Sequence, residues 1–350
     1  MSAEQPNPTG RDKQRTESKA AIGILLVPIF FVIGFSACII GAYHKPHPNN
    51  IKFGVVGPSA LTAPLRAGLE KQAAPLGFEI SQIDSVPQAV ADVRQRKLNA
   101  AFVPTADPKR PAIVIVAGSG GRLVATAAET LARAVASEQG AQLVTQDVRP
   151  LTPGDEIGLG VFMLMVVCTI CGYLAASLLY TAAPDLAPSR RYPMLAAVSI
   201  LVPTIAYLIG GLGYGVYVGS AGTIFSVIGV AALYTFVICL VTRLFQVLLG
   251  PPALFVALAV FVFLNIPSLG ASYTATMLPP FWRFLNHFWL GAETTNAERS
   301  LLYFGGQGVG PDLLRLLAWT AVAVALLALP VSRILARQNK RPVVAKPIGP

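Results

Sequence analysis

The chain has 350 residues, of which 54% are hydrophobic and only 13% are charged. Soluble domains have about 25% charged residues, so this composition, with a mean hydropathy of +0.60, argues against a wholly soluble protein. No charged residue lies between Arg191 and Arg243 or between Arg243 and Arg283, and such runs exceed the roughly 20 residues that cross a bilayer. The net charge of +10 is divided among short segments, which argues against nucleic-acid binding.

The chain begins with a polar segment, residues 1–19, which we interpret as a cytoplasmic tail. Residues 20–43 are apolar and predict a transmembrane helix. A signal peptide is the alternative, because Phe35-Ser36-Ala37-Cys38 loosely resembles a lipoprotein cleavage box. The apolar run continues beyond Cys38 and is longer than a signal-peptide core, so an uncleaved anchor is the favoured interpretation.

Residues 44–155 are more polar and predict one extracytoplasmic α/β domain. Strand and helix patterns alternate along it, which is typical of a mostly parallel sheet covered by helices. Strands are expected at 51–56, 78–83, 100–104, 112–116 and 142–147, and helices at 60–74, 87–97 and 122–138. The strand at 112–116 is fully apolar, as expected of a buried interior strand.

A glycine-rich turn between the fourth strand and the last helix of this domain is a candidate ligand site. Its residues are Gly118, Ser119, Gly120, Gly121 and Arg122. Backbone amides at a helix N-terminus can bind an anion. However, Leu123 occupies the position where a dinucleotide fingerprint has glycine, and the lysine of a phosphate loop is absent. A plain tight turn is the alternative interpretation.

Residues 156–332 predict a domain of five transmembrane helices. The spans are expected at 157–180, 194–213, 221–242, 253–267 and 313–332. The second and third of these form a hairpin through the glycine-rich segment 210–215, where glycine permits reversal and close helix packing.

The positive charges set the expected orientation. Cations cluster in the N-terminal tail, at Arg190 and Arg191, at Arg243 after the fourth span, and in the basic C-terminal tail 333–350. Six spans place all of these segments on one side, so the positive-inside rule predicts a plasma-membrane protein with both termini in the cytoplasm. On the opposite side we expect the nearly balanced set Arg283, Glu293, Glu298, Arg299 and Asp312.

The segment 278–300 is rich in aromatic residues and predicts an interfacial or re-entrant helix. It offers Phe281, Trp282, Arg283, His287 and Trp289 as a candidate substrate-lining lip. Arg283 and His287 are four residues apart and share a helix face. A plain interfacial belt is the alternative interpretation.

Other reactive residues give no recognisable catalytic or metal site. All four cysteines lie in apolar runs, and the Cys168–Cys171 pair lies within a span without partner ligands, so core packing is the favoured role. His44 and His47 alone are a poor metal site. No serine–histidine–acid or paired-carboxylate set is recognisable, so neither an enzyme, a cofactor nor a bound metal is expected. Because no ionisable residue lies near the middle of a predicted span, energy for transport is expected from a partner.

The layout and three segments together resemble a known family. Residues 85–104, with a helix leading into a small-apolar strand that ends at Pro104, residues 147–155, and residues 278–306 are similar to the ABC-type-2 membrane permeases, especially their phage infection protein (Pip)-like branch with one external α/β domain. The resemblance implies a permease half that forms a homodimer and pairs with a separate cytoplasmic ATPase, or a relative of the type VII secretion apparatus. The loop 184–191 departs from the family because it is short and proline-rich and leaves little room for a coupling helix.

The sequence therefore predicts an α-helical polytopic membrane protein with six transmembrane helices and an inserted extracytoplasmic α/β domain. The first functional hypothesis is a permease-like subunit in the lipid bilayer that moves or helps to export an amphipathic or lipidic substrate. The second is a non-transporting scaffold or receptor whose external domain binds a cell-wall component or a partner protein.

Overall fold

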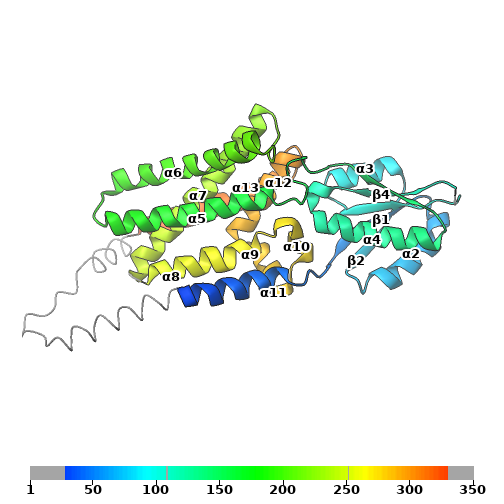
Figure 1. The fold of residues 1–350 in the computed structure, drawn as a ribbon, viewed down its shortest axis with the longest axis horizontal. Coiled ribbons are helices and arrows are strands. Elements are labelled where there is room, and N and C mark those ends of the chain that lie inside the picture. Colours follow the sequence, from blue (N-terminus) through cyan, green and yellow to red (C-terminus); the bar gives the residue numbers. More distant parts are fainter. Residues whose placement is uncertain (1–27, 108, 251, 330–350) are drawn as a thin grey trace, which may run out of the picture.

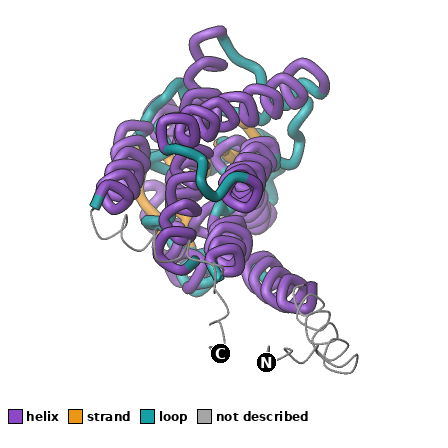
Figure 2. The backbone as a smooth tube through the Cα atoms, turned by 90° about the vertical axis from the view of Figure 1, so that its left-hand side faces the viewer, coloured by secondary structure: helices purple, strands orange, loops and turns teal. Residues whose placement is uncertain are grey.

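The computed structural model describes residues 28–107, 109–250 and 252–329. The predictions for residues 1–27 and 330–350, which include both tails, lie outside these ranges. Within them the molecule is elongated, with a helical bundle at one end and a five-stranded sheet with its helices at the other (Figure 1). Seen end on, the helices of the bundle lie in front of the strands (Figure 2).

The sheet follows the predicted elements closely. The strands are β1 (Ile51–Val56), β2 (Phe78–Ile83), β3 (Ala100–Val103), β4 (Ala112–Val116) and β5 (Leu143–Asp147), and the helices are α2 (Ser59–Ala73), α3 (Val86–Arg94) and α4 (Arg122–Glu138). The strand order is β2-β1-β3-β4-β5. Only the β3–β4 pair is antiparallel, so the prediction of a mostly parallel sheet is confirmed. The prediction that the apolar strand β4 lies in the interior is also confirmed.

Two hydrophobic layers cover the two faces of the sheet. Helices α2 and α4 pack on one face, and α3 packs on the other. Each layer also includes a residue from the helical part of the chain, namely Met277 on the α2–α4 face and Phe304 on the α3 face. The hydrophobic layers of the sheet therefore extend to residues of the helical part, so the two parts of the molecule pack against each other.

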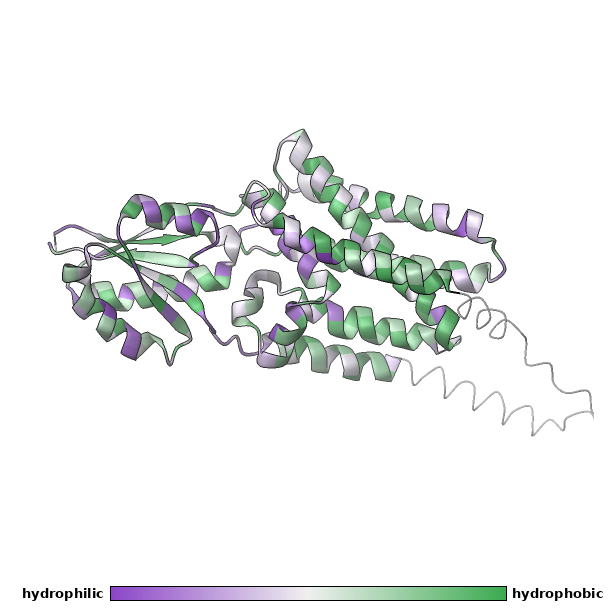
Figure 3. Ribbon diagram, turned by 180° about the vertical axis from the view of Figure 1, so that it is seen from behind, coloured by the Kyte–Doolittle hydropathy of each residue, from purple (hydrophilic) through white to green (hydrophobic). Residues whose placement is uncertain are grey.

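Among the described residues, four helices of the bundle are long and apolar enough to cross a membrane. They are α5 (Gly160–Ala182), α6 (Pro188–Leu208, continued through η2 to Gly213), α7 (Ala221–Leu249) and α13 (Val309–Ala328). Two shorter apolar helices accompany them, Pro28–Tyr43 and Ala253–Ser268, and the latter comprises α8 (Ala253–Leu258), η3 (Ala259–Asn265) and α9 (Ile266–Ser268). Hydrophobic residues dominate these helices (Figure 3). A helix therefore occupies each predicted span that lies within the described residues.

Several predicted span boundaries are off by a few residues, and the largest differences are at the start of α6, which is Pro188 instead of residue 194, and at the end of α7. We expected the span 221–242 to end before Arg243, but α7 continues to Leu249. Arg243 is 7% exposed, and its guanidinium lies 5.3 Å from the centroid of the Tyr180 ring. The aromatic face replaces part of the hydration of the cation, so the helix does not need to end at the charge.

Four short helices lie between α9 and α13. They are η4 (Ala271–Tyr273), α10 (Thr274–Met277), α11 (Pro280–Asn286) and α12 (Leu290–Tyr303). Helix α12 packs against α5, α7 and α13, and Glu293, Glu298 and Arg299 on it are buried. The sequence predicted on which side of the membrane these three residues lie but not that they are buried, because α12 is polar and hydropathy does not detect the burial of a polar helix.

Candidate functional site

The predicted ligand turn lies where the sheet meets the bundle. Gly118–Gly120 form the short helix η1, and α4 begins at Arg122. Every backbone amide of the four residues before Arg122 is used within the protein. Gly118 N donates to the Asp147 carboxylate at 3.1 Å, and Ser119 N donates to the Arg149 carbonyl at 3.0 Å. Gly120 N and Gly121 N donate to the carbonyls of residues 117 and 118. The turn therefore presents no unused amide of these residues to an anion.

The glycines of this turn have a packing role instead. Gly121 has φ +146°, and a Cβ there would lie 2.6 Å from Thr274 Cγ2. A Cβ at Gly118 would lie 2.6 Å from Asp147 Oδ2. The sequence pattern of glycines is thus explained by close approach of the turn to its neighbours. Its role as a ligand site stays a prediction.

A cavity of about 250 Å³ lies beside the turn, between the sheet and α12. Arg96 reaches into it from the segment after α3, donates to Ser300 Oγ at 2.8 Å, and lies 5.3 Å from the Phe304 ring centroid. Burial lowers the pKa of the Arg96 guanidinium, and the Asp312 carboxylate partly opposes this effect. Arg96 therefore connects the sheet domain to helix α12 of the bundle through a polar contact.

The aromatic segment divides into exposed and buried residues. Phe281 is 55% exposed and His287 is also exposed, whereas Arg283 and Trp289 are half-buried. Trp282 is 6% exposed and packs in a cluster with other buried apolar residues, Ala42, Leu278 and Leu285. The exposed rings suit an interface with lipid. The role of the segment as a substrate lip stays a prediction.

Cys168 and Cys171 lie on α5, and His44 directly follows the helix Pro28–Tyr43. Cys168 is buried in the main hydrophobic cluster of the bundle, and Cys171 is half-buried. His44 Nδ1 lies 2.8 Å from the Ile40 carbonyl oxygen. Among the described residues, no group of three or more histidine, cysteine, aspartate or glutamate side chains is placed to hold a metal ion.

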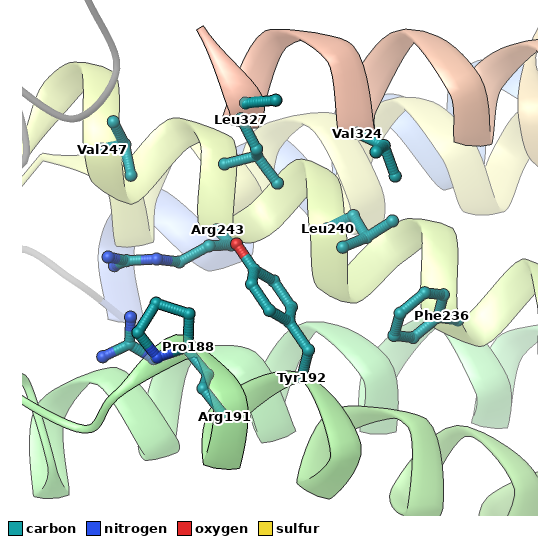
Figure 4. Close-up of a pocket in the computed structure, with 10 residues that line it drawn as sticks. Pro188, Arg191, Tyr192, Phe236, Leu240, Arg243, Val247, Val324 and Leu327 are labelled. Atoms are coloured by element: carbon teal, nitrogen blue, oxygen red, sulfur yellow. The ribbon is translucent and has the colours of Figure 1, made fainter. Parts of the chain in front are cut away.

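The most distinctive site in the bundle is a pocket of about 490 Å³ between α6, α7 and α13 (Figure 4). The lining side chains of α7 recur every three or four residues and so share one helix face. The residues that line the pocket are Pro188, Arg191 and Tyr192 on α6, Phe236, Leu240, Arg243 and Val247 on α7, and Val324, Leu327 and Ala328 on α13. We call it the arginine pocket.

The arginine pocket has a cationic end and an apolar end. Figure 4 shows the guanidinium groups of Arg191 and Arg243 together at one end, and Phe236, Leu240 and Val324 toward the other. The two cations are close enough to repel each other. An occupant that suits both ends would be an amphiphile with an anionic head and an apolar chain.

Both arginines are buried, and neither has an anionic partner in the part of the chain that the structure describes. Arg191 is 6% exposed and donates from Nη2 to the Pro184 carbonyl at 3.0 Å, while its Nε has no hydrogen-bond partner among the described residues. Arg243 donates from Nη1 to Gln246 Oε1 at 3.4 Å. Within the described ranges neither guanidinium forms an ion pair. Because a buried, unpaired cation is costly, two of them together strongly favour binding of an anion.

The sequence analysis used these two arginines only to predict the orientation of the helices in the membrane. One signal for a binding role was present, since Arg243 separates two long uncharged runs. What the sequence does not show is that α6 and α7 bring the two cations to the same place. Comparison with known proteins finds no matching family model, curated protein or solved structure.

Proposed function

We propose that this protein is a permease-like membrane subunit that binds and moves an anionic, lipid-like amphiphile. Six helices would cross the bilayer, namely the N-terminal helix, α5, α6, α7, the α8–α9 unit and α13. The sheet would lie on the extracytoplasmic side. The resemblance to ABC-type-2 permeases supports the same proposal and adds a homodimer and a separate cytoplasmic ATPase as expected partners.

The arginine pocket is the observation that carries this proposal. Helix α5 starts beside the sheet at Gly160, so its end at Ala182 and the following start of α6 lie at the far end of the bundle (Figure 1). Under the positive-inside rule, Arg190, Arg191 and Arg243 make this the cytoplasmic end. The pocket would then receive its ligand from the inner leaflet, with the head group on the guanidinium groups and the acyl chain along α7 and α13.

Binding of phosphatidylglycerol to the purified protein tests the proposal. Native mass spectrometry compares it with phosphatidylcholine of the same acyl chains. We expect the wild type to prefer phosphatidylglycerol, and Arg191→Gln or Arg243→Gln to weaken its binding. A hydrogen bond to a charged group contributes about 1.5–3 kcal/mol, which corresponds to roughly a ten- to hundredfold loss of affinity.

Arg190→Gln is the matched control, because it removes an equal charge from the neighbouring, exposed residue. It should retain wild-type binding. The double variant Arg191→Gln/Arg243→Gln should melt at the same or a higher temperature, since it removes uncompensated buried charge. Unchanged preference for phosphatidylglycerol in that double variant would refute the pocket as the binding site.

Transport itself is measured in proteoliposomes with a fluorescent phosphatidylglycerol whose outer-leaflet fraction is chemically quenched. The wild type should move the label between leaflets, supplied with its ATPase if native membranes yield one. The double arginine variant should be slower. If the wild type binds phosphatidylglycerol but does not move it between leaflets, with or without an ATPase, the result would favour the receptor hypothesis over the permease.

A further inference from the structure

Helix α12 carries two buried glutamates, of which one has a cationic partner and the other has none among the described residues. Glu293 is 1% exposed and is paired with Arg315, whose Nη1 lies 2.9 Å from Oε1 and 2.7 Å from Oε2. Arg315 also lies 3.8 Å from Asp312 on α13. Glu293 therefore lies within a cluster of charged side chains.

Glu298 lies on another side of the same helix and has no such cluster. Its exposure is 0%, and neither carboxyl oxygen has a hydrogen-bond partner among the described residues. The ionisable groups that interact with it are neutral ones: Cys168 on α5, Tyr207 on α6, and Tyr217 before α7. The Tyr207 hydroxyl also has no partner among the described residues.

The other polar and charged groups on neighbouring elements interact with residues other than Glu298. Asp312 and Arg315 on α13 engage Glu293. Arg299 interacts with Asp155 and Tyr303, and Arg96 bonds to Ser300. Tyr234 on α7 bonds to Thr169 and Asn265. Arg283 and His287 on α11 are half-buried and exposed, respectively. No cation is placed to neutralise Glu298 within the described residues.

Burial without a partner favours the neutral acid, because an isolated carboxylate in such a place loses its hydration with nothing in return. A groove of about 670 Å³ lies between α5 and α6 at the end near the sheet, and Asp155, Cys171 and Tyr217 are among its lining residues. Tyr217 donates to the Gly160 carbonyl at 2.8 Å, and both Asp155 and Glu298 are near enough to act on it electrostatically, so Glu298 lies within electrostatic range of the lining of this groove.

We propose that Glu298 is a proton-binding site through which a proton gradient acts on the bundle. In the structure described here the carboxyl group holds its proton. When α12 moves and water of the groove reaches the group, the O–H bond breaks, the proton passes to water, and the carboxylate remains. The sequence had suggested that the energy for transport must come from a partner, since no ionisable residue lies near the middle of a predicted span. Glu298 supplies an ionisable group in the bundle itself.

Infrared spectroscopy of the reconstituted protein at neutral pH tests the proposal directly. The carbonyl band of a protonated carboxylic acid should be present in the wild type and in Glu293→Gln. One component of this band should be lost in Glu298→Gln and should return in Glu298→Asp. An unchanged band in Glu298→Gln would show that Glu298 is ionised, which overturns the proposal.

The pH dependence of unfolding gives a second readout. Because the folded protein keeps a proton that the unfolded chain releases, raising the pH above the ordinary range of glutamate should destabilise the wild type. The ratio of folded to unfolded protein should fall about tenfold per pH unit while the native proton is retained. The slope should be smaller by one proton, about tenfold per pH unit, in Glu298→Gln and unchanged in Glu79→Gln, whose carboxyl is on the exposed side of β2. An equal slope in all three proteins would also overturn the proposal. Neither readout uses an anionic lipid, so failure here leaves the arginine pocket standing.

Discussion

Asn265 is the residue whose loss should most clearly disturb the position of α12. It is fully buried at the end of η3, its Nδ2 donates to the Tyr234 hydroxyl at 2.7 Å, and its Oδ1 accepts from Gly291 N at 3.1 Å. Helix α12 begins at Leu290, and the residue before it, Trp289, has no side-chain hydrogen bond to the helix. Asn265 therefore caps α12 from a different element.

Asn265→Leu keeps the branched shape of the side chain, although its methyl groups are larger, and removes all the hydrogen bonds of the amide group. The Gly291 amide would then be buried without a partner, which costs about 1–3 kcal/mol. The loss at the Tyr234 hydroxyl should cost less free energy, because this hydroxyl keeps its hydrogen bond to Thr169 Oγ1 at 2.6 Å. We expect the free energy of unfolding to fall by about 2–4 kcal/mol in total, the amide and the weakened hydroxyl together.

Unfolding in detergent, followed by intrinsic tryptophan fluorescence, measures the loss. Asn296→Leu is the matched control: it is the same substitution within α12, at a half-buried residue with no side-chain hydrogen bond among the described residues. It should change stability by less than about 0.5–1 kcal/mol. If both variants lose equally, or if Asn265→Leu unfolds like the wild type, then Asn265 does not cap α12.

Two further substitutions probe the joint with the sheet and the aromatic segment. Gly121→Ala should destabilise by about 1–3 kcal/mol, because its Cβ would meet Thr274 Cγ2 at 2.6 Å. Gly68→Ala in α2, where the Cβ meets nothing within 4 Å, should instead stabilise by about 0.5–1 kcal/mol, and thermal unfolding separates the two. Trp282→Ala should cost about 3–5 kcal/mol of stability, whereas Phe284→Ser, at a ring that is 62% exposed, should weaken partition into lipid vesicles with little effect on unfolding in detergent. Equal melting temperatures for these last two variants would contradict the division into buried and exposed rings.

The sheet could be predicted almost residue by residue. The predicted bounds of β1, β2 and α4 are those of the structure, because polar and turn residues interrupt each apolar run at the place where its element ends. Strand direction was the part that local pattern could not give. β4 is antiparallel to β3, although its apolar sequence is typical of a parallel strand.

The bundle was predictable only where burial and hydrophobicity coincide. Long apolar runs gave the helices, but α12 is buried while carrying two glutamates and an arginine. Arg315 pairs with Glu293, Asn265 accepts from Gly291 N and Arg96 donates to Ser300, and these three partners come from three other elements. No window of neighbouring residues contains those partners, so a polar segment of this kind is indistinguishable from a surface helix in the sequence.

The glycine turn and the arginine pocket both show that local sequence patterns do not contain contacts between residues distant in the chain. The glycine turn looked like an anion site because its local pattern is right, yet Asp147 and Arg149, distant in sequence, already accept its amides. Arg191 and Arg243 looked like ordinary topogenic charges because each one alone obeys the positive-inside rule. That rule requires cations at the cytoplasmic ends of helices, but it does not require them to be buried, unpaired and brought together in one pocket. Since such an arrangement costs stability unless an anion is bound, its presence is better explained by a ligand than by orientation alone.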